Sequence, residues 1–150
     1  MSVHLAKTLR PKQSVIGRLE SGSAIIQSLE QYCDANQIRT AWVQCLGAVN
    51  QATLSYYDQQ AKGYHHHPMT GELEIVSCYG NITQKEGKAF AHLHGVFSNE
   101  AFQCFGGHLW PGTTSVFLVE FHLQTFEDDL TLDAPLCRLH DEPTGLYIWQ

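Results

Sequence analysis

The chain has 150 residues, of which 43% are hydrophobic and 16% are charged, and its formal net charge at pH 7 is −6. This length and hydrophobic content predict one folded domain and exclude an intrinsically disordered chain. The negative balance, nine Lys and Arg against fifteen Asp and Glu, lacks the electrostatic footprint of a protein that binds a phosphate backbone.

The first quarter of the chain predicts two short extended segments and one amphipathic helix. Val3–Leu9 and Ser14–Leu19 are strand-like, and Pro11 is expected to end the first of them. Between residues 23 and about 36, apolar side chains recur at helical spacing and polar side chains fall on the opposite side. We therefore predict one main helix over residues 23–36, starting near Ser21-Gly22.

The rest of the chain predicts strands. Residues 40–49 and 52–57 are expected to form a hairpin around a turn at Asn50-Gln51. Further strands are expected at residues 72–83, 88–97, 101–109 and 114–124, and around 130–139. One helix followed by consecutive strands predicts an α+β fold, with a single compact domain over residues 1–150 and a largely antiparallel or mixed sheet.

The cysteines and the lack of long apolar runs indicate the compartment. The five cysteines include no C-x-x-C pair, and several lie in apolar runs, which is typical of free buried thiols in a reducing compartment. No apolar signal core follows the first residues, and no run reaches membrane-spanning length. These features predict a soluble, cytoplasmic protein.

Three histidines form the most informative pattern in the sequence. His92 and His94 are one residue apart on a predicted strand, so both side chains point to the same face. His108 follows Gly106-Gly107 at the end of the next short segment. Three imidazoles that converge and leave a fourth position open are typical of a site for zinc or a related divalent ion. Hydrogen-bonded core histidines, or acid–base catalysis without a metal, are the alternatives.

The strand that carries His92 and His94 is apolar on both faces. One face carries residues 89, 91, 93, 95 and 97, and the other face carries residues 90, 92, 94 and 96. A strand of this kind is expected to be covered on both sides, by its own core and by a second layer or subunit.

Two carboxylates and a second group of histidines are further candidates. Glu74 and Glu120 lie within apolar strands, where an ionised carboxylate is costly unless it is paired. Either could accept an N–H from a ligand imidazole or act as general base for a metal-bound water. The alternative, favoured for Glu120, is a carboxylate paired at a subunit interface or facing solvent. The run His65-His66-His67 is expected to form an exposed loop before Pro68.

A series of motifs resembles the plant and prokaryote conserved (PPC) domain. They are Gly47-Ala48 with residues 52–58, then Gly71–Val76, Gly80–Ile82, His92–His94 and Gly106–Leu109. The resemblance covers residues 10–124 and leaves 125–150 as a C-terminal extension. It implies a homotrimer of compact α/β subunits. It also implies, in the prokaryotic branch, a metal bound by His92, His94 and His108.

The resemblance to plant members is weaker at the positions through which those proteins act. Plant relatives place this domain after AT-hooks, and their partner-binding hexapeptide is Gly-Arg-Phe-Glu-Ile-Leu. In this chain Glu72 stands in place of the arginine, and no Arg-Gly-Arg-Pro core occurs. DNA binding is therefore not expected.

Together the sequence predicts a trimeric metal-binding protein of the PPC type that acts through protein or small-ligand contacts. Its metal is expected to be a divalent ion, with zinc as the default, held by His92, His94 and His108. A metal-dependent hydrolase or lyase, with Glu74 near the ion, is one alternative. A DNA-binding transcriptional regulator is the other.

Overall fold

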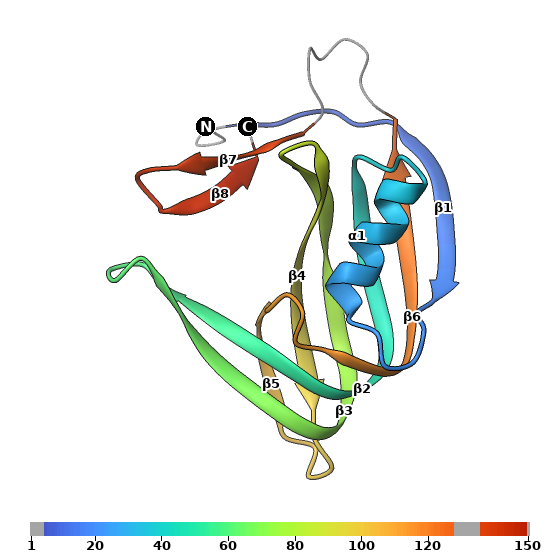
Figure 1. The fold of residues 1–150 in the computed structure, drawn as a ribbon, viewed down its shortest axis with the longest axis vertical. Helices are drawn as coiled ribbons and strands as arrows, with labels where there is room; N and C mark the ends of the chain where they lie inside the picture. The colour runs from blue at the N-terminus through green and yellow to red at the C-terminus, as the bar shows by residue number, and fades with distance from the viewer. Residues whose placement is uncertain (1–4, 128–135, 150) are drawn as a thin grey trace.

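A six-stranded sheet in the order β1-β6-β2-β3-β4-β5 forms the framework of the protein (Figure 1). The computed structural model describes residues 5–127 and 136–149. The strands are β1 (Pro11–Arg18), β2 (Ala41–Asp58), β3 (Gly63–Lys85), β4 (Lys88–Ser98), β5 (Cys104–Leu109) and β6 (Ser115–Phe126). Every neighbouring pair is antiparallel, and β2 also pairs with β5, so four of the strands close on themselves. The predicted α+β fold with a largely antiparallel sheet is confirmed.

The helix of the described chain, α1 (Ile25–Ala35), lies within the predicted range and packs beside β4. Its apolar stripe, which includes Ile25 and Leu29, is buried in the core. The start predicted near Ser21-Gly22 is early, because the N-cap residue is Ala24, which has no side-chain acceptor. Instead, Thr114 Oγ1 accepts a hydrogen bond of 2.8 Å from the Ile25 amide. This end of the helix is therefore capped by a residue from another part of the chain.

Strands β2 and β3 are longer than the sequence predicted. The expected turn at Asn50-Gln51 is wrong, since β2 continues through these residues with an irregular register. At this point β2 changes neighbours: its pairing with β6 ends at Gln51, and its pairing with β5 begins at Leu54. The polar pair therefore marks a bend in one strand. The far ends of β2 and β3 form an arm that projects from the rest of the sheet (Figure 1).

Both ends of the chain depart from the prediction. Residues 5–9 form no strand, and β1 begins at Pro11, because a proline is tolerated at the first position of an edge strand. The strand expected at 130–139 falls largely outside the described residues. Its last two residues begin a short hairpin that the sequence did not predict, formed by β7 (Arg138–Asp141) and β8 (Leu146–Trp149).

The β7–β8 turn is attached to the arm. Tyr57 Oη donates a hydrogen bond of 2.6 Å to the Thr144 carbonyl oxygen, and Lys62 Nζ donates one of 3.0 Å to the Glu142 carbonyl oxygen. The arm and the hairpin therefore lie on the same side of the molecule (Figure 1).

Within the described chain the two faces of β4 differ in burial, so the chain itself supplies the predicted cover on one side only. Ala89, Ala91, Leu93 and Phe97 are buried in the core, whereas Phe90, His92 and Val96 are half-buried and His94 is exposed. The first half of β4 is joined to α1 by two hydrogen bonds. The Ala89 amide donates to Asp34 Oδ1, and the Ala91 amide donates to Glu30 Oε1. We call the face of the sheet that carries His94 the outer face.

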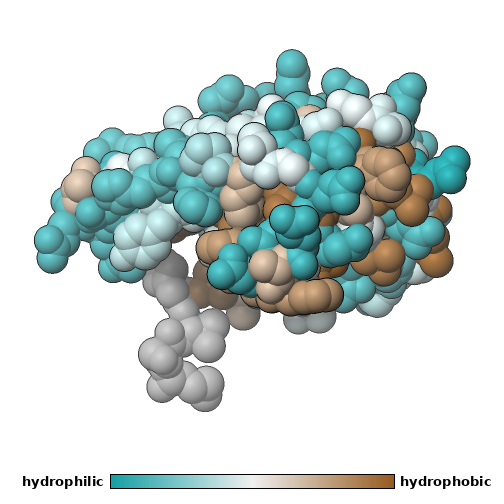
Figure 2. Space-filling model, turned by 90° about the horizontal axis from the view of Figure 1, so that it is seen from below, coloured by the Kyte–Doolittle hydropathy of each residue, from teal (hydrophilic) through white to brown (hydrophobic). Residues whose placement is uncertain are grey.

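The outer face carries exposed apolar side chains. Directly paired residues share a face of a sheet, and one such row crosses all six strands. From β1 to β5 it runs Ile16, His122, Gln44, Tyr79, His94 and His108. Ile16 and Tyr79 are 82% and 60% exposed, and Trp42 and Leu46, two positions either side of Gln44, are 55% and 60% exposed. In Figure 2, hydrophobic surface gathers on the side where β1 and β6 lie.

Candidate metal site

Strands β4 and β5 bring His92, His94 and His108 together on the outer face. His94 pairs directly with His108, and His92 lies two residues along β4 on the same face. The three imidazole centroids are 5.0–5.4 Å apart, and one ligand atom from each ring lies within 4.8 Å of the others. The three histidines therefore converge, and their binding of a metal stays a prediction.

Two glycines allow the neighbouring strands to approach the histidines. A Cβ at Gly80 would lie 1.9 Å from the carbonyl oxygen of His92. A Cβ at Gly107, next to His108, would lie 3.0 Å from the Ser55 carbonyl oxygen. Side chains at these positions would push β3 away from β4 and β5 away from β2. The glycines therefore help to fix the backbone from which His92 and His108 project.

Burial keeps two of the imidazoles neutral. Partial burial, with nearby positive charge on Arg138 as a second cause, lowers the pKa of His92 to about 4. Burial and the neighbouring His94 lower the pKa of His108 to about 4 as well. A neutral imidazole has a free nitrogen lone pair, which is the form that binds a metal. His92 and His108 are therefore available as ligands at neutral pH without first losing a proton.

Arg138 of β7 contacts the site, and the sequence alone did not reveal it. Its Nη2 lies 3.3 Å from His92 Nδ1 and donates to Asn81 Oδ1 at 2.9 Å. Its Nε donates to Thr83 Oγ1 at 2.9 Å, and its Nη1 donates to the Tyr147 carbonyl oxygen at 3.0 Å. In the sequence, Arg138 is a single arginine between apolar residues of the C-terminal extension. This pattern gave no reason to place its side chain at His92.

Three aromatic rings, which we call the aromatic wall, lie beside His108. The wall consists of Tyr64, His66 and Trp110. The Tyr64 ring lies 5.5 Å from the His108 ring and 5.0 Å from the Trp110 ring, and His66 lies 4.3 Å from Trp110. Burial raises the pKa of the Tyr64 hydroxyl, so it is protonated at neutral pH. The site thus has Arg138 beside His92 and aromatic rings beside His108.

The structure does not bring the candidate carboxylates to the histidines. Glu74 is exposed and pairs with Ser98, four residues along β4 from His94. Glu120 is also exposed, which agrees with the expectation that this carboxylate faces solvent. Among the residues that the structure describes, the group of converging metal-ligand atoms contains histidines and no carboxylate.

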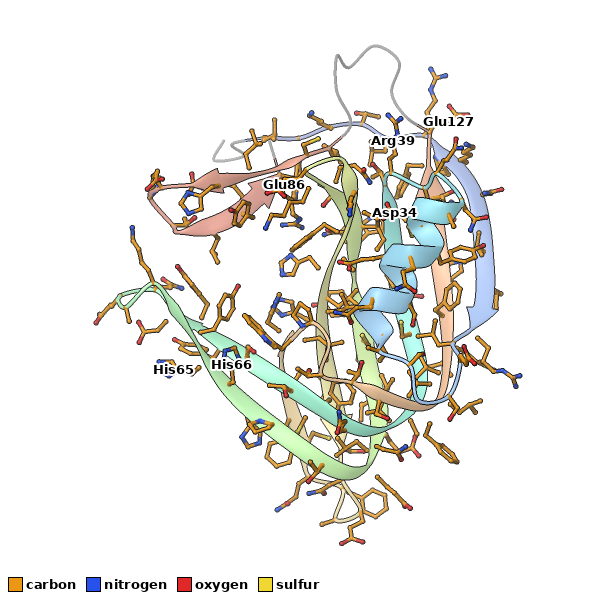
Figure 3. The ribbon with its side chains drawn as sticks, viewed as in Figure 1. Asp34, Arg39, His65, His66, Glu86 and Glu127 are labelled. Atoms are coloured by element: carbon orange, nitrogen blue, oxygen red, sulfur yellow. The ribbon has the colours of Figure 1, made fainter. Side chains whose placement is uncertain are left out.

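The run His65-His66-His67 lies on β3, so the predicted loop is wrong, although all three residues are exposed as expected. Figure 3 shows His65 and His66 on the projecting arm. His65 Nε2 is 3.5 Å from Asp58 Oδ2, and His66 Nδ1 is 2.8 Å from Ser55 Oγ. The local alternation of the strand directs these neighbours to different partners, and only His66 reaches the surroundings of the metal site.

A cavity of about 300 Å³ lies beside the histidine site. Its mainly apolar lining includes Trp42 and Trp149 and contains none of the three histidines. It also includes Asn81 and Thr83, which accept hydrogen bonds from Arg138. We place the candidate site at the three histidines on the outer face, because among the described residues it is their ligand atoms that converge.

A comparison with known protein families identifies the family of this chain. A family model of the Plants and Prokaryotes Conserved (PCC) domain, the PPC domain named above, matches residues 6–127. The chain belongs to this family. Arg138 and the β7–β8 hairpin lie outside the part of this PPC protein that the family model matches.

Two solved structures share the fold of this PPC protein over nearly their whole length. A metal-containing protein from Archaeoglobus fulgidus is 28% identical, with a TM-score of 0.88 and coverage of 97% of this chain and 99% of that one. A PPC protein from Pyrococcus horikoshii is 25% identical, with a TM-score of 0.88 and coverage of 97% and 96%. The resemblance inferred from the motifs is therefore confirmed at the level of family and fold.

A third relative is much longer than this PPC protein. The bifunctional protein GlmU of Synechococcus sp. (strain JA-2-3B'a(2-13)) is 28% identical over 127 residues, which are 84% of this chain. The chain spans 18% of the length of that relative. Separately, in the part of the chain that the structure describes, no helix is long and apolar enough to cross a membrane.

Proposed function

We propose that this PPC protein binds one divalent transition-metal ion through His92, His94 and His108 and presents it to a small ligand. The convergence of three ligand atoms within 4.8 Å of one another carries the proposal. Three imidazoles suit zinc, which we expect as the native ion, and leave a coordination position open. The similar protein from Archaeoglobus fulgidus, which is described as metal-containing, supports the proposal.

The residues present fit such an ion. His92 and His108 are neutral above a pH of about 4, and His94 is exposed, so its ring can turn toward an ion without disturbing the core. When bound, a zinc ion would act as a Lewis acid toward the ligand in its open position. The chain itself would hold the ion, with the aromatic wall beside His108 and Arg138 beside His92.

Ligand binding is better supported than hydrolysis. A metal-bound water needs a group nearby to take its proton, and Glu74, the candidate general base, is exposed and distant along the sheet. The DNA-binding alternative requires a positive surface, whereas the formal net charge is −6. The geometry therefore favours a metal centre that holds a small molecule.

Elemental analysis of untagged protein, purified without added metal or chelator, tests the proposal. We expect close to one transition-metal ion per chain. A chain that contains no ion after purification, and that still takes up none when incubated with zinc and desalted, would contradict it.

We also propose that the outer face is the subunit interface of a homotrimer. Exposed apolar side chains at Ile16, Trp42, Leu46 and Tyr79 support this, because contiguous apolar surface on a folded chain marks an association site. The apolar residues on both faces of β4 have the same explanation. His94 lies in the same row of residues, so the interface would border the metal site.

Analytical ultracentrifugation tests the trimer. The wild-type protein should have a sedimentation mass three times that of the monomer. Trp42→Glu should dissociate the trimer, because the substitution would bury a charge in the interface. Leu139→Glu is a matched control, since Leu139 is 54% exposed on β7, away from this face. A wild-type monomer, or equal dissociation of both variants, would contradict the assignment.

A further inference from the structure

We propose that the ligand of this metal site is a small organic carboxylate, held between the bound ion and the guanidinium of Arg138. The inference rests on the proposed metal site and names the class of molecule that occupies its open position.

The first observation is that Arg138 is buried without a carboxylate partner among the residues that the structure describes. Arg138 is 6% exposed. Its guanidinium forms hydrogen bonds with neutral groups of Thr83, Tyr147, Asn81 and His92. No Asp or Glu of the described chain forms an ion pair with it. A buried guanidinium is normally paired, because leaving a charge uncompensated is costly. An anion bound beside it would supply the missing countercharge.

The second observation is that the ion and Arg138 compete for His92. A neutral imidazole has one N–H and one acceptor nitrogen. His92 Nδ1 accepts the Arg138 hydrogen bond only when it carries a lone pair and no metal. If the ion binds Nδ1, that lone pair is taken; if it binds Nε2, the proton moves to Nδ1. In both cases Arg138 loses this acceptor when the metal binds.

Loading the metal therefore leaves a guanidinium N–H without an acceptor beside the ion. One oxygen of a carboxylate can take the open position on the ion while the other accepts this N–H. The protein then recovers the hydrogen bond that it lost, so metal and carboxylate should bind cooperatively. A neutral ligand would fill the coordination position and leave the arginine unpaired.

The charges and the surrounding surface favour the same class of ligand. The three histidines are expected to bind as neutral ligands, and no carboxylate of the described chain joins them, so a divalent ion would remain uncompensated apart from the ligand. Phe90 lies 5.2 Å from the Arg138 guanidinium, and Tyr64 stands beside His108. These rings suit a ligand with an apolar body, which favours an organic carboxylate over an inorganic oxoanion.

The test uses the whole chain loaded with cobalt(II), whose visible absorption reports changes in its ligands. Benzoate, benzamide and inorganic phosphate are titrated as probes. We expect benzoate to shift the cobalt absorption saturably, and benzamide, which has the same shape without the charge, to bind at least tenfold more weakly. Phosphate should bind more weakly than benzoate.

Arg138→Gln keeps hydrogen-bond donors and removes the charge. It should bind cobalt with unchanged stoichiometry and bind benzoate about 10- to 100-fold more weakly, the effect of losing a hydrogen bond to a charged group. Leu139→Gln, a substitution at the next residue of β7, is the matched control and should bind benzoate as the wild-type chain does. Because the comparison of benzoate with benzamide is made on the wild-type chain, the test stands even if Arg138→Gln disturbs the hairpin.

Different results would overturn different parts of the reasoning. A wild-type chain that binds cobalt but responds equally to benzoate and benzamide would overturn the carboxylate inference and leave the metal site standing. Tighter binding of phosphate than benzoate would also overturn it. Unchanged benzoate affinity in Arg138→Gln would remove Arg138 from the ligand site. A wild-type chain that binds no cobalt would instead overturn the proposed function.

Discussion

Two groups of three histidines occur in this protein, and they behave differently. His65, His66 and His67 are consecutive on β3, yet their side chains contact Asp58, Ser55 and the Phe105 ring respectively. His92, His94 and His108 come from two strands, and their ligand atoms lie within 4.8 Å of one another. Adjacency in the sequence thus separates side chains on a strand, whereas pairing across strands brings them together.

The two groups also differ in their surroundings. All three members of the run are exposed on the arm, where water solvates the imidazoles and competes for any ion (Figure 3). In the converging group, burial lowers the pKa of His92 and His108 to about 4. The group on β4 and β5 therefore differs from the run in two ways, because its ligand atoms converge and two of its imidazoles are partly buried.

The largest expected difference between the two groups is in metal binding. His94→Ala should weaken binding of zinc by more than about 100-fold, because it removes a direct ligand, and loss of an outer partner alone costs 10- to 100-fold. The chain should stay folded, since His94 is exposed. Metal content after zinc loading and desalting, with thermal unfolding as the control for folding, measures this.

His65→Ala is the matched control for that variant. It removes an exposed histidine of the run and should retain one ion per chain. A His94→Ala protein that keeps one tightly bound ion would show that the ligand assignment is wrong.

The next effect is on the pH dependence of stability in the metal-free chain. The pKa of His92 and His108 is about 4 in the folded chain, against an ordinary value of 6.5. Between these pH values the unfolded chain binds protons that the folded chain does not. The contribution of these histidines to the free energy of unfolding is therefore fully present above pH 6.5 and is lost as the pH falls toward about 4.

Urea denaturation of chelator-treated protein at pH 7.5, 6.0 and 5.0 measures this loss. His108→Gln should lose less stability over this range than the wild-type chain, whereas His65→Ala should match the wild type. Equal losses in His108→Gln and wild type would mean that His108 is not a buried neutral imidazole.

A smaller effect is expected from His66, the member of the run that reaches the aromatic wall. His66→Ala removes the ring that packs on Trp110, at 4.3 Å, without removing a ligand. Zinc affinity should fall by less than about tenfold, the lower end of the effect of losing a group that directly orients a ligand. Competition with a chromophoric chelator measures it, and His67→Ala, beside Phe105, should cause no change. A loss as large as that of His94→Ala would place His66 among the ligands.

The smallest effect is expected from Glu72→Arg, which restores the residue of the plant hexapeptide. Glu72 is exposed on β3, on the stretch between the histidine run and the residues that pair with His94. Zinc content should be unchanged when it is measured as for His94→Ala. Loss of the ion in this variant would show that the site lies elsewhere.

The local patterns predicted many elements and failed where a strand changes neighbours. Strands β4 and β6 and helix α1 follow from the alternation or helical spacing of their own residues. The turn expected at Asn50-Gln51 is a bend, because pairing with β5 carries β2 onward past two polar residues. A polar pair inside an apolar run reads the same in the sequence whether the chain reverses there or only bends.

The sequence by itself determined the donor set and its local geometry. A period of two places His92 and His94 on one face, and three imidazoles favour a divalent ion, with zinc as the default. Only the tertiary structure decided what surrounds them. Arg138 lies 46 positions from His92 in the chain, and their contact depends on how β7 packs against β3. Side-chain periodicity is a property of neighbouring residues, whereas the charge beside the three histidines comes from packing between distant ones.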